Sequence, residues 1–233
     1  MKKLGLIGGM GPESTVPYYH DIVYGVQNRL GRDVFPTLTI ESVDVFQVLG
    51  MCTRQDYDGL VEYLLTALRN LAAAGAEFGA LSANTPHIVF NRLEQESPIP
   101  LVSIVEATCQ EVVRRNKKKV GLLGTRFTME GAFYHRPFQR AGVTLVTPDE
   151  GERSFVNEKI TNELERGIVK PETQAAFLQI VRRMVDEEGI EALILGCTEL
   201  PLLFQSVAHP PVECLDTVAI HVAALVDRIL EAE

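Results

Sequence analysis

The segment KKLGLIG at residues 2–8 returns as KKVGLLG at residues 118–124, and this repetition indicates how the chain folds. A second pair follows in the same order, because GAEFGAL at residues 75–81 corresponds to GIEALIL at residues 189–195. A weaker pair, PLV at residues 100–102 and PVE at residues 211–213, comes third. Matching segments in one fixed order, separated by nearly constant distances, predict two related halves.

Short apolar runs rich in strand-forming residues alternate with amphipathic stretches, which predicts an α/β fold with parallel sheets. Helical spacing of apolar residues predicts helices over 57–71 and 177–185, which we expect to stop at Gly75 and Gly189. The predicted strands are residues 4–7, 37–40, 78–81, 101–104, 120–123, 144–146, 192–195 and 212–215.

The repeat predicts two similar α/β domains related by a pseudo-two-fold axis. The first comprises residues 1–98 together with a returning C-terminal helix at about 213–233, and the second comprises residues 99–212. Ligands of such sheets bind beyond the carboxyl ends of the strands. We therefore expect the active site in a cleft between the two halves.

Composition excludes several functional classes. With 22 basic and 31 acidic residues, the net charge of −9 disfavours nucleic acid as a partner. No apolar run reaches the roughly 20 residues that span a bilayer, so we expect a cytoplasmic protein without a membrane segment. The cysteines form no CxxC pair and the histidines no HxH or HExxH motif, so we expect no metal site. The glycine-rich start lacks the third glycine of a dinucleotide-binding loop.

One cysteine occupies a position suited to catalysis. The strand at 192–195 ends in GCTE at residues 196–199, so Cys197 is expected on a turn that leads into a helix. A helix N-terminus favours thiolate over thiol, which predicts a lowered pKa for Cys197, although a cysteine after a strand is also a common packing residue. The repeat pairs Cys197 with Ala83 in SANTPH at residues 82–87, and we expect positions 83 and 197 to face each other across the cleft.

Four motifs together resemble the aspartate/glutamate racemase family over essentially the whole chain. They are GGMGPEST at residues 8–15, NT at 84–85, GTRFT at 124–128 and GCTE at 196–199. The resemblance implies a homodimer without cofactor, in which two cysteines, one in each half, remove and return the α-proton of an amino acid without pyridoxal phosphate. Cys197 matches the second cysteine. Ala83 departs from the first, where the family has cysteine or threonine.

Substrate-binding residues follow from the chemistry and from the resemblance. Proton removal next to a carboxylate builds negative charge there, so the site needs preorganised hydrogen-bond donors. Candidates at strand ends or helix starts are Asn84, Thr85, Thr125, Thr128 and Thr198, for each of which helix capping is the alternative. The resemblance adds Met10. Arg54 and Arg166 are candidates for binding a side-chain carboxylate, and the alternative for both is a solvated surface charge.

The leading functional hypothesis is a racemase of aspartate or glutamate that is independent of pyridoxal phosphate, with Cys197 as one base. Ala83 is then either an introduced substitution that removes one base or a natural replacement that is tolerated because another group donates the proton. A single-cysteine decarboxylase of the arylmalonate type is the first alternative, since it needs only one thiol. A non-catalytic binding protein for an amino acid or a small diacid is the second.

Overall fold

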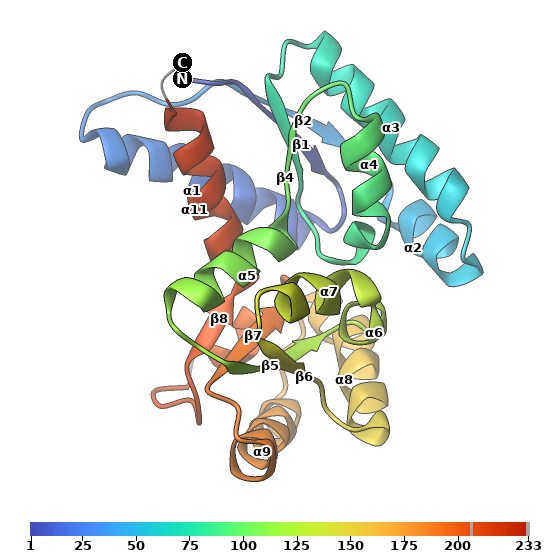
Figure 1. Cartoon of the computed structure of the whole chain (residues 1–233), viewed down its shortest axis with the longest axis vertical. Helices are drawn as coiled ribbons and strands as arrows, with labels where there is room; N and C mark the ends of the chain where they lie inside the picture. The colour runs from blue at the N-terminus through green and yellow to red at the C-terminus, as the bar shows by residue number, and fades with distance from the viewer. Residues whose placement is uncertain (206, 232–233) are drawn as a thin grey trace. The chain divides into compact units, whose positions relative to one another are not determined.

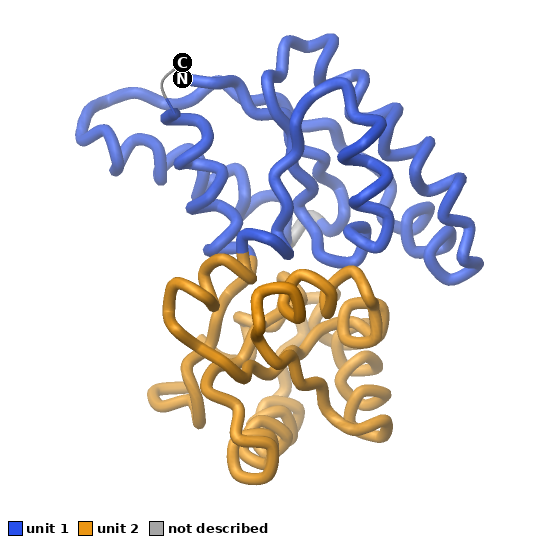
Figure 2. Tube along the Cα trace, viewed as in Figure 1, with its two compact units in different colours: residues 1–107, 218–233 blue, residues 108–217 orange. Residues whose placement is uncertain are grey.

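The computed structural model describes residues 1–205 and 207–231. Its contacts divide the chain into two compact units (Figure 2). Unit 1 contains residues 1–107 and the segment from Val218 onward, and unit 2 contains residues 108–217. The divisions therefore fall inside helix α5 (Ile104–Arg114) and in the first turn of helix α11 (Thr217–Leu230), whereas the sequence-based division lies near residues 98 and 213.

Unit 1 contains strands β1 to β4 and helices α1 to α4 (Figure 1). In chain order its elements before α5 are β1 (Leu4–Gly8), α1 (Pro12–Leu30), β2 (Leu38–Ser42), α2 (Val45–Arg54), α3 (Tyr57–Ala73), β3 (Phe78–Leu81), η1 (Thr85–Val89), α4 (Phe90–Glu96) and β4 (Leu101–Val102). Helix α11 returns to this unit at the end of the chain.

Unit 2 contains the other four strands and the intervening helices. Its elements are β5 (Lys119–Gly124), α6 (Arg126–Glu130), α7 (Ala132–Arg140), β6 (Thr144–Val146), α8 (Glu150–Asn162), η2 (Leu164–Arg166), α9 (Pro171–Glu188), β7 (Ala192–Gly196), α10 (Pro201–Phe204) and β8 (Cys214–Asp216).

The two units have the same sheet topology. The strand order is β2-β1-β3-β4 in unit 1 and β6-β5-β7-β8 in unit 2, and every pairing is parallel. The predicted α/β class with two parallel sheets is confirmed, and each of the eight predicted strands corresponds to an observed one. Strand β4 ends two residues earlier than predicted, because the Ser103 hydroxyl accepts hydrogen bonds from the Val105 and Glu106 amides and starts α5.

The repeated glycine of each first strand has a packing reason. A Cβ at Gly5 would lie 2.8 Å from the Ala76 Cβ and 3.0 Å from the Leu71 Cβ. A Cβ at Gly121 would lie 2.8 Å from Ile190 Cδ1, in the matching place of unit 2. Both glycines therefore allow the C-terminal end of a later helix, α3 in unit 1 and α9 in unit 2, to lie directly against the sheet.

The sheets are covered by apolar helix faces. In unit 1, Leu4 and Leu6 of β1 belong to one core cluster with residues of α1 and α11, two helices that lie side by side in Figure 1. In unit 2, residues of α8 and α9 pack against β7 in a second cluster. Burial on both faces explains why the central strands are apolar throughout their length.

Both predicted helix ends lie close to the observed ones. Helix α9 ends at Glu188, directly before the Gly189 at which the sequence predicted its stop, and Gly189 adopts the left-handed conformation with φ 68°. Helix α3 ends at Ala73, and Gly75 follows with φ 84°. Glycine reaches these angles without steric cost, so each helix stops and the chain turns into the next strand.

Candidate active site

Cys197 and the GTRFT segment lie at the same edge of the unit 2 sheet. Strands β5 and β7 pair directly, with Gly124 opposite Gly196, so the residues that follow both strands emerge side by side. A Cβ at Gly124 would lie 3.0 Å from the Gly196 carbonyl oxygen and 3.1 Å from the Thr128 Cβ. Glycine at this position lets the two chain segments approach closely.

The Cys197 thiol forms a pair with a carboxylate. Its Sγ donates a hydrogen bond to Glu199 Oε2 over 2.9 Å, and the Thr198 hydroxyl donates to the same oxygen over 2.7 Å. Both Cys197 and Glu199 are buried, with 7% and 6% of their surface exposed. A thiol and a carboxylate at this separation are able to share one proton.

The predicted lowering of the Cys197 pKa is wrong. Burial, followed by the negative charge of Glu199 and the hydrogen bond to it, raises the pKa of Cys197 well above its usual value. Helix α10 begins only at Pro201 and has four residues, so it provides little dipole potential at the thiol. The carboxylate at 2.9 Å outweighs that potential, and the protonated thiol is the stable form in the absence of substrate.

A second carboxyl group and an arginine lie on the η2 turn of the same unit. Desolvation, and then the charge of Glu199, raise the pKa of Glu165, while the neighbouring Arg166 lowers it. The charge of Glu165 in turn contributes to the raised pKa of Cys197. Glu165 and Arg166 both remain exposed as residues.

Neither carboxylate is among the site residues that the sequence predicted. Glu199 stands two residues after the cysteine in the GCTE motif, which was a usable signal, because a turn brings such neighbours together. Glu165 is more than thirty residues away in sequence, and only the fold brings its charge close to Cys197.

Thr125 and Thr128 form the first turn of α6. The Thr125 hydroxyl accepts a hydrogen bond from the Thr128 amide, and the two hydroxyl oxygens lie 3.2 Å apart. Thr125 thus caps the helix, which is the alternative role that the sequence left open for it. Thr128 is fully buried.

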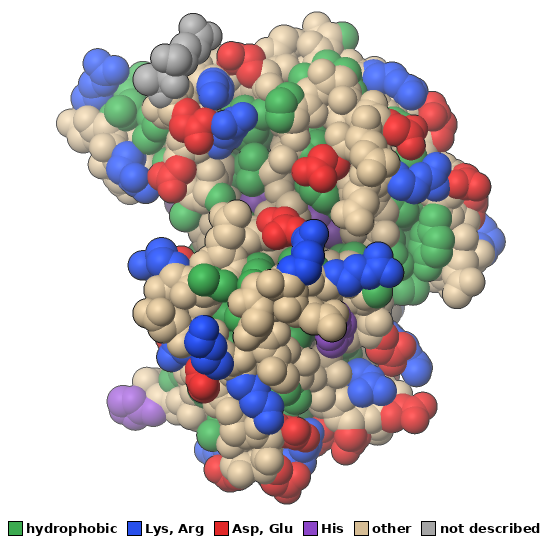
Figure 3. Space-filling model, in the orientation of Figure 1, with side chains coloured by type: hydrophobic (Ala, Val, Ile, Leu, Met, Phe, Trp, Pro, Cys, Tyr) green, Lys and Arg blue, Asp and Glu red, His purple; other side chains and the backbone are tan. Residues whose placement is uncertain are grey.

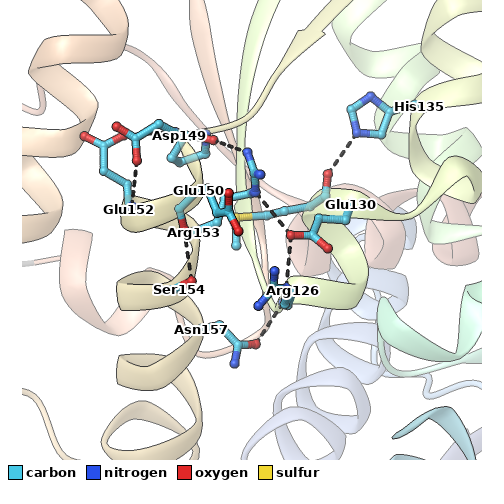
Figure 4. Close-up of polar contacts among 11 residues, drawn as sticks. Arg126, Glu130, His135, Asp149, Glu150, Glu152, Arg153, Ser154 and Asn157 are labelled. Carbon is cyan, nitrogen blue, oxygen red and sulfur yellow. Dashed lines mark hydrogen bonds and ion pairs between the residues drawn. The ribbon is translucent and has the colours of Figure 1, made fainter. Parts of the chain in front are cut away.

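A polar network fixes α6 to the neighbouring helix α8 (Figure 4). The Arg126 amide donates to Asn157 Oδ1 over 2.8 Å, and the Arg126 side chain pairs with Glu130 Oε1 at 3.0 Å. Arg153 reaches the same Glu130 oxygen at 3.3 Å. These contacts hold the helix start that carries Thr125 in one place at the sheet edge.

The candidate residues of unit 1 lie at the corresponding edge of the other sheet. Met10 follows β1, and the segment of Ala83, Asn84 and Thr85 follows the adjacent strand β3. Met10 and Asn84 are buried, whereas Ala83 and Thr85 are half-buried. Arg54 is the last residue of α2 and is exposed.

A buried histidine fixes the turn at Ala83. His87 Nδ1 lies 3.0 Å from the Ala83 carbonyl oxygen, and His87 Nε2 accepts a hydrogen bond from the Ile104 amide over 3.3 Å. This pattern assigns the proton to Nδ1. Burial and the proximity of His221 lower the pKa of His87 to about 3, so the ring is neutral at physiological pH.

The surface and the helices add three observations. Across residues 1–205 and 207–231, no group of three or more His, Cys, Asp or Glu side chains is arranged to hold a metal ion. None of the described helices has the length and apolar character needed to cross a bilayer. On the face drawn in Figure 3, basic and acidic side chains are interspersed.

Comparison with known proteins decides the family. The model of the Asp/Glu/hydantoin racemase family matches residues 7–225, which is nearly the whole chain. The chain belongs to this family.

Named members of the Asp/Glu/hydantoin racemase family are similar over most of their length. The broad-specificity amino-acid racemase of Bacillus subtilis is 26% identical over 207 residues, which cover 84% of this chain and 85% of the relative. A crystal structure of an aspartate racemase homologue from Pyrococcus horikoshii is 35% identical with a TM-score of 0.84, covering 99% of this chain and 100% of that one. A crystal structure from Yersinia pestis, described as a candidate Asp/Glu racemase, is 36% identical with a TM-score of 0.91 at the same coverage. The chain is therefore placed among the amino-acid racemases, which are isomerases.

Proposed function

We propose that this protein transfers protons at the α-carbon of an acidic amino acid, aspartate or glutamate, without pyridoxal phosphate, and that Cys197 and Glu199 carry the step together. The observation that supports this most directly is the 2.9 Å hydrogen bond from the buried Cys197 thiol to the Glu199 carboxylate. The pair lies after strand β7, at the carboxyl edge where ligands of parallel sheets bind.

In this proposal the α-proton is removed in two proton transfers, which are then reversed. Glu199 takes the proton from the Cys197 thiol, and the resulting thiolate removes the α-proton of the substrate, so that the C–H bond breaks and the S–H bond re-forms. The electron pair left on the α-carbon spreads onto the substrate carboxylate. The Cys197 thiol then gives a proton back to the α-carbon, and the thiolate that remains takes up the proton held by Glu199, which restores the starting state.

The remaining candidate residues have supporting roles. Thr198 donates to the same oxygen of Glu199 and so orients the carboxylate that receives the thiol proton. Asn84, Thr85, Thr125 and Thr128 are proposed as donors to the charged substrate carboxylate, together with the backbone around Met10. Arg54 and Arg166 are proposed to bind the side-chain carboxylate of the substrate.

Ala83 limits what the proposed chemistry achieves. Alanine has no ionisable group, so a proton that Cys197 removes returns to the face from which it came. Exchange of the α-hydrogen with solvent is therefore expected without efficient inversion. The two origins of Ala83, an introduced substitution and a natural replacement supported by another donor, predict different rates of inversion in this chain.

The single-cysteine decarboxylase is a second candidate, for one specific reason. Because the resting thiol is protonated beside a carboxylate, Cys197 is suited to donate a proton to a carbanion that is formed by loss of carbon dioxide. The non-catalytic binding protein is the remaining outcome if no proton transfer occurs.

Proton NMR in deuterated water tests these functions directly. L- and D-aspartate and L- and D-glutamate are incubated with the protein, and with Cys197→Ala and Glu199→Gln. We expect loss of the α-proton signal in the unaltered chain and a slower loss in both variants. An arylmalonate substrate serves as the parallel test for decarboxylation. Binding of an amino acid without exchange or decarboxylation would leave only the binding-protein function.

We also propose that the chain forms a homodimer, as the family resemblance implies. Helix α1 exposes Val16, Tyr19 and Tyr24, and the Tyr24 ring contacts the exposed Phe35 ring edge-on at 5.8 Å. Such exposed apolar side chains are suited to a protein interface. Light scattering of Tyr24→Glu, with Phe46→Glu on α2 as the control, measures whether this face supports the dimer.

A further inference from the structure

We propose that Glu163 is a positioning residue for the Cys197 site: its carboxylate joins the end of α8 to the start of α9 and so holds the turn at residues 164–167, which carries Glu165 and Arg166. The importance of this position for catalysis rests on the function proposed above for Cys197. The geometry of the turn is independent of that function.

The Glu163 carboxylate is buried and bound on both oxygens. Its Oε2 accepts a hydrogen bond from the Thr173 hydroxyl over 2.6 Å, and its Oε1 accepts from Lys159 Nζ over 2.9 Å and from Lys170 Nζ over 3.2 Å. Only 5% of Glu163 is exposed. The bond from Thr173 and those from the lysines lower the pKa of Glu163 to about 2, so the group is ionised at neutral pH.

The backbone of the same residue closes the turn. The Glu163 carbonyl accepts hydrogen bonds from the Arg166 amide over 3.1 Å and from the Ile168 amide over 2.9 Å. Gly167 adopts φ 69°, and its amide donates to the Leu164 carbonyl over 2.9 Å. Side chain and backbone of Glu163 therefore fix both sides of the 164–167 turn.

The turn is connected to the Cys197 segment through the core of unit 2. Leu164 is fully buried in the same hydrophobic cluster as Cys197, Leu200 and Leu203. Helix α9 adds a direct bond, because Gln174 Nε2 donates to the Leu203 carbonyl over 2.6 Å. A shift of the turn would consequently change the surroundings of the thiol.

The turn also brings charge to the thiol. Glu165 follows Leu164 directly, and its negative charge contributes to the raised pKa of Cys197, while the charge of Glu199 contributes to the raised pKa of Glu165. Glu163 itself is neutralised by two lysines, so its influence on the thiol passes through the placement of Glu165. This indirect action distinguishes a positioning residue from a residue that only stabilises the fold.

A double-mutant cycle on the full chain tests the proposal. The variants are Glu163→Gln, Glu165→Gln and the combination of both, with Glu158→Gln on the exposed side of α8 as the matched control. Iodoacetamide alkylation of Cys197 is measured by mass spectrometry across a pH series without substrate. Circular dichroism establishes that each variant is folded.

We expect both single variants to raise the alkylation rate of Cys197 at about pH 8 by roughly threefold or more, which corresponds to half a pKa unit in the thiolate fraction. The combined variant should react no faster than Glu165→Gln alone, because Glu163 acts through Glu165. Glu158→Gln should match the unaltered chain.

Additive effects of the two substitutions, or an unchanged rate in Glu163→Gln, would overturn the proposal. If Glu163→Gln does not fold, Thr173→Val removes one donor from the same carboxylate and takes its place in the cycle. The measurement needs no substrate, so a failure of the racemase function in the NMR experiment and a failure of this positioning role are separate results.

Discussion

Replacing Glu199 by glutamine should make Cys197 more reactive as a thiol and less effective in catalysis. The Cys197 sulfur lies 2.9 Å from the Glu199 carboxylate, so a thiolate would form next to a negative charge. Two unit charges about 4 Å apart interact by about 4 kcal/mol at an effective dielectric constant near 20. If only a third of that repulsion is relieved, about 1.4 kcal/mol, the thiolate fraction rises roughly tenfold.

The assay is the rate of iodoacetamide alkylation at Cys197 near neutral pH, followed by mass spectrometry of the peptide that contains it. Thr198→Val is the matched control, because it removes the other hydrogen bond to the same oxygen and leaves the charge in place. We expect a tenfold increase for Glu199→Gln and none for Thr198→Val. Exchange of the substrate α-hydrogen should fall by about 10²–10⁴, since the acceptor of the thiol proton is gone. An alkylation rate in Glu199→Gln equal to that of the unaltered chain would refute the electrostatic reasoning.

Three further predictions concern the whole protein. Ala83→Cys should raise the rate of inversion of aspartate or glutamate, measured by chiral chromatography, by a factor of at least about 10². Cys197→Ala in that background should abolish inversion. An Ala83→Cys variant that folds and binds substrate but inverts it no faster would argue against a two-base site. Aspartate or glutamate should raise the melting temperature, and at a concentration of a hundred times Kd the native state should be stabilised by about 2.7 kcal/mol. NAD, ATP and pyridoxal phosphate should leave the melting temperature unchanged. A shift with a nucleotide alone would contradict the assignment of an amino-acid-binding site. The melting temperature measured by calorimetry should fall as the pH decreases below 6.5. Burial lowers the pKa of His87 to about 3 and that of His221 to about 4, so these histidines take up protons in the unfolded chain before they do so in the folded protein. A melting temperature that stays constant down to pH 5 would contradict this.

The sequence alone determined the class of fold. The repeated segments at 2–8 and 118–124 and at 75–81 and 189–195 predicted two related sets of parallel strands, and the two sheets have the same strand order. This inference was possible because strands that are buried on both faces need apolar residues throughout, and because glycine alone fits at positions such as Gly5 and Gly121. These requirements are local and are therefore readable in the chain.

The tertiary structure alone decided the electrostatics of the candidate site. The sequence predicted a lowered pKa for Cys197 from its expected place at the start of a helix, but burial and the carboxylate of Glu199 raise the pKa. Likewise, nothing near Cys197 in sequence indicated the charge of Glu165 or the carboxylate of Glu163 that holds its turn. A pKa depends on the solvent that the fold removes and on the charges that it brings close from distant segments, so the order of residues does not fix it.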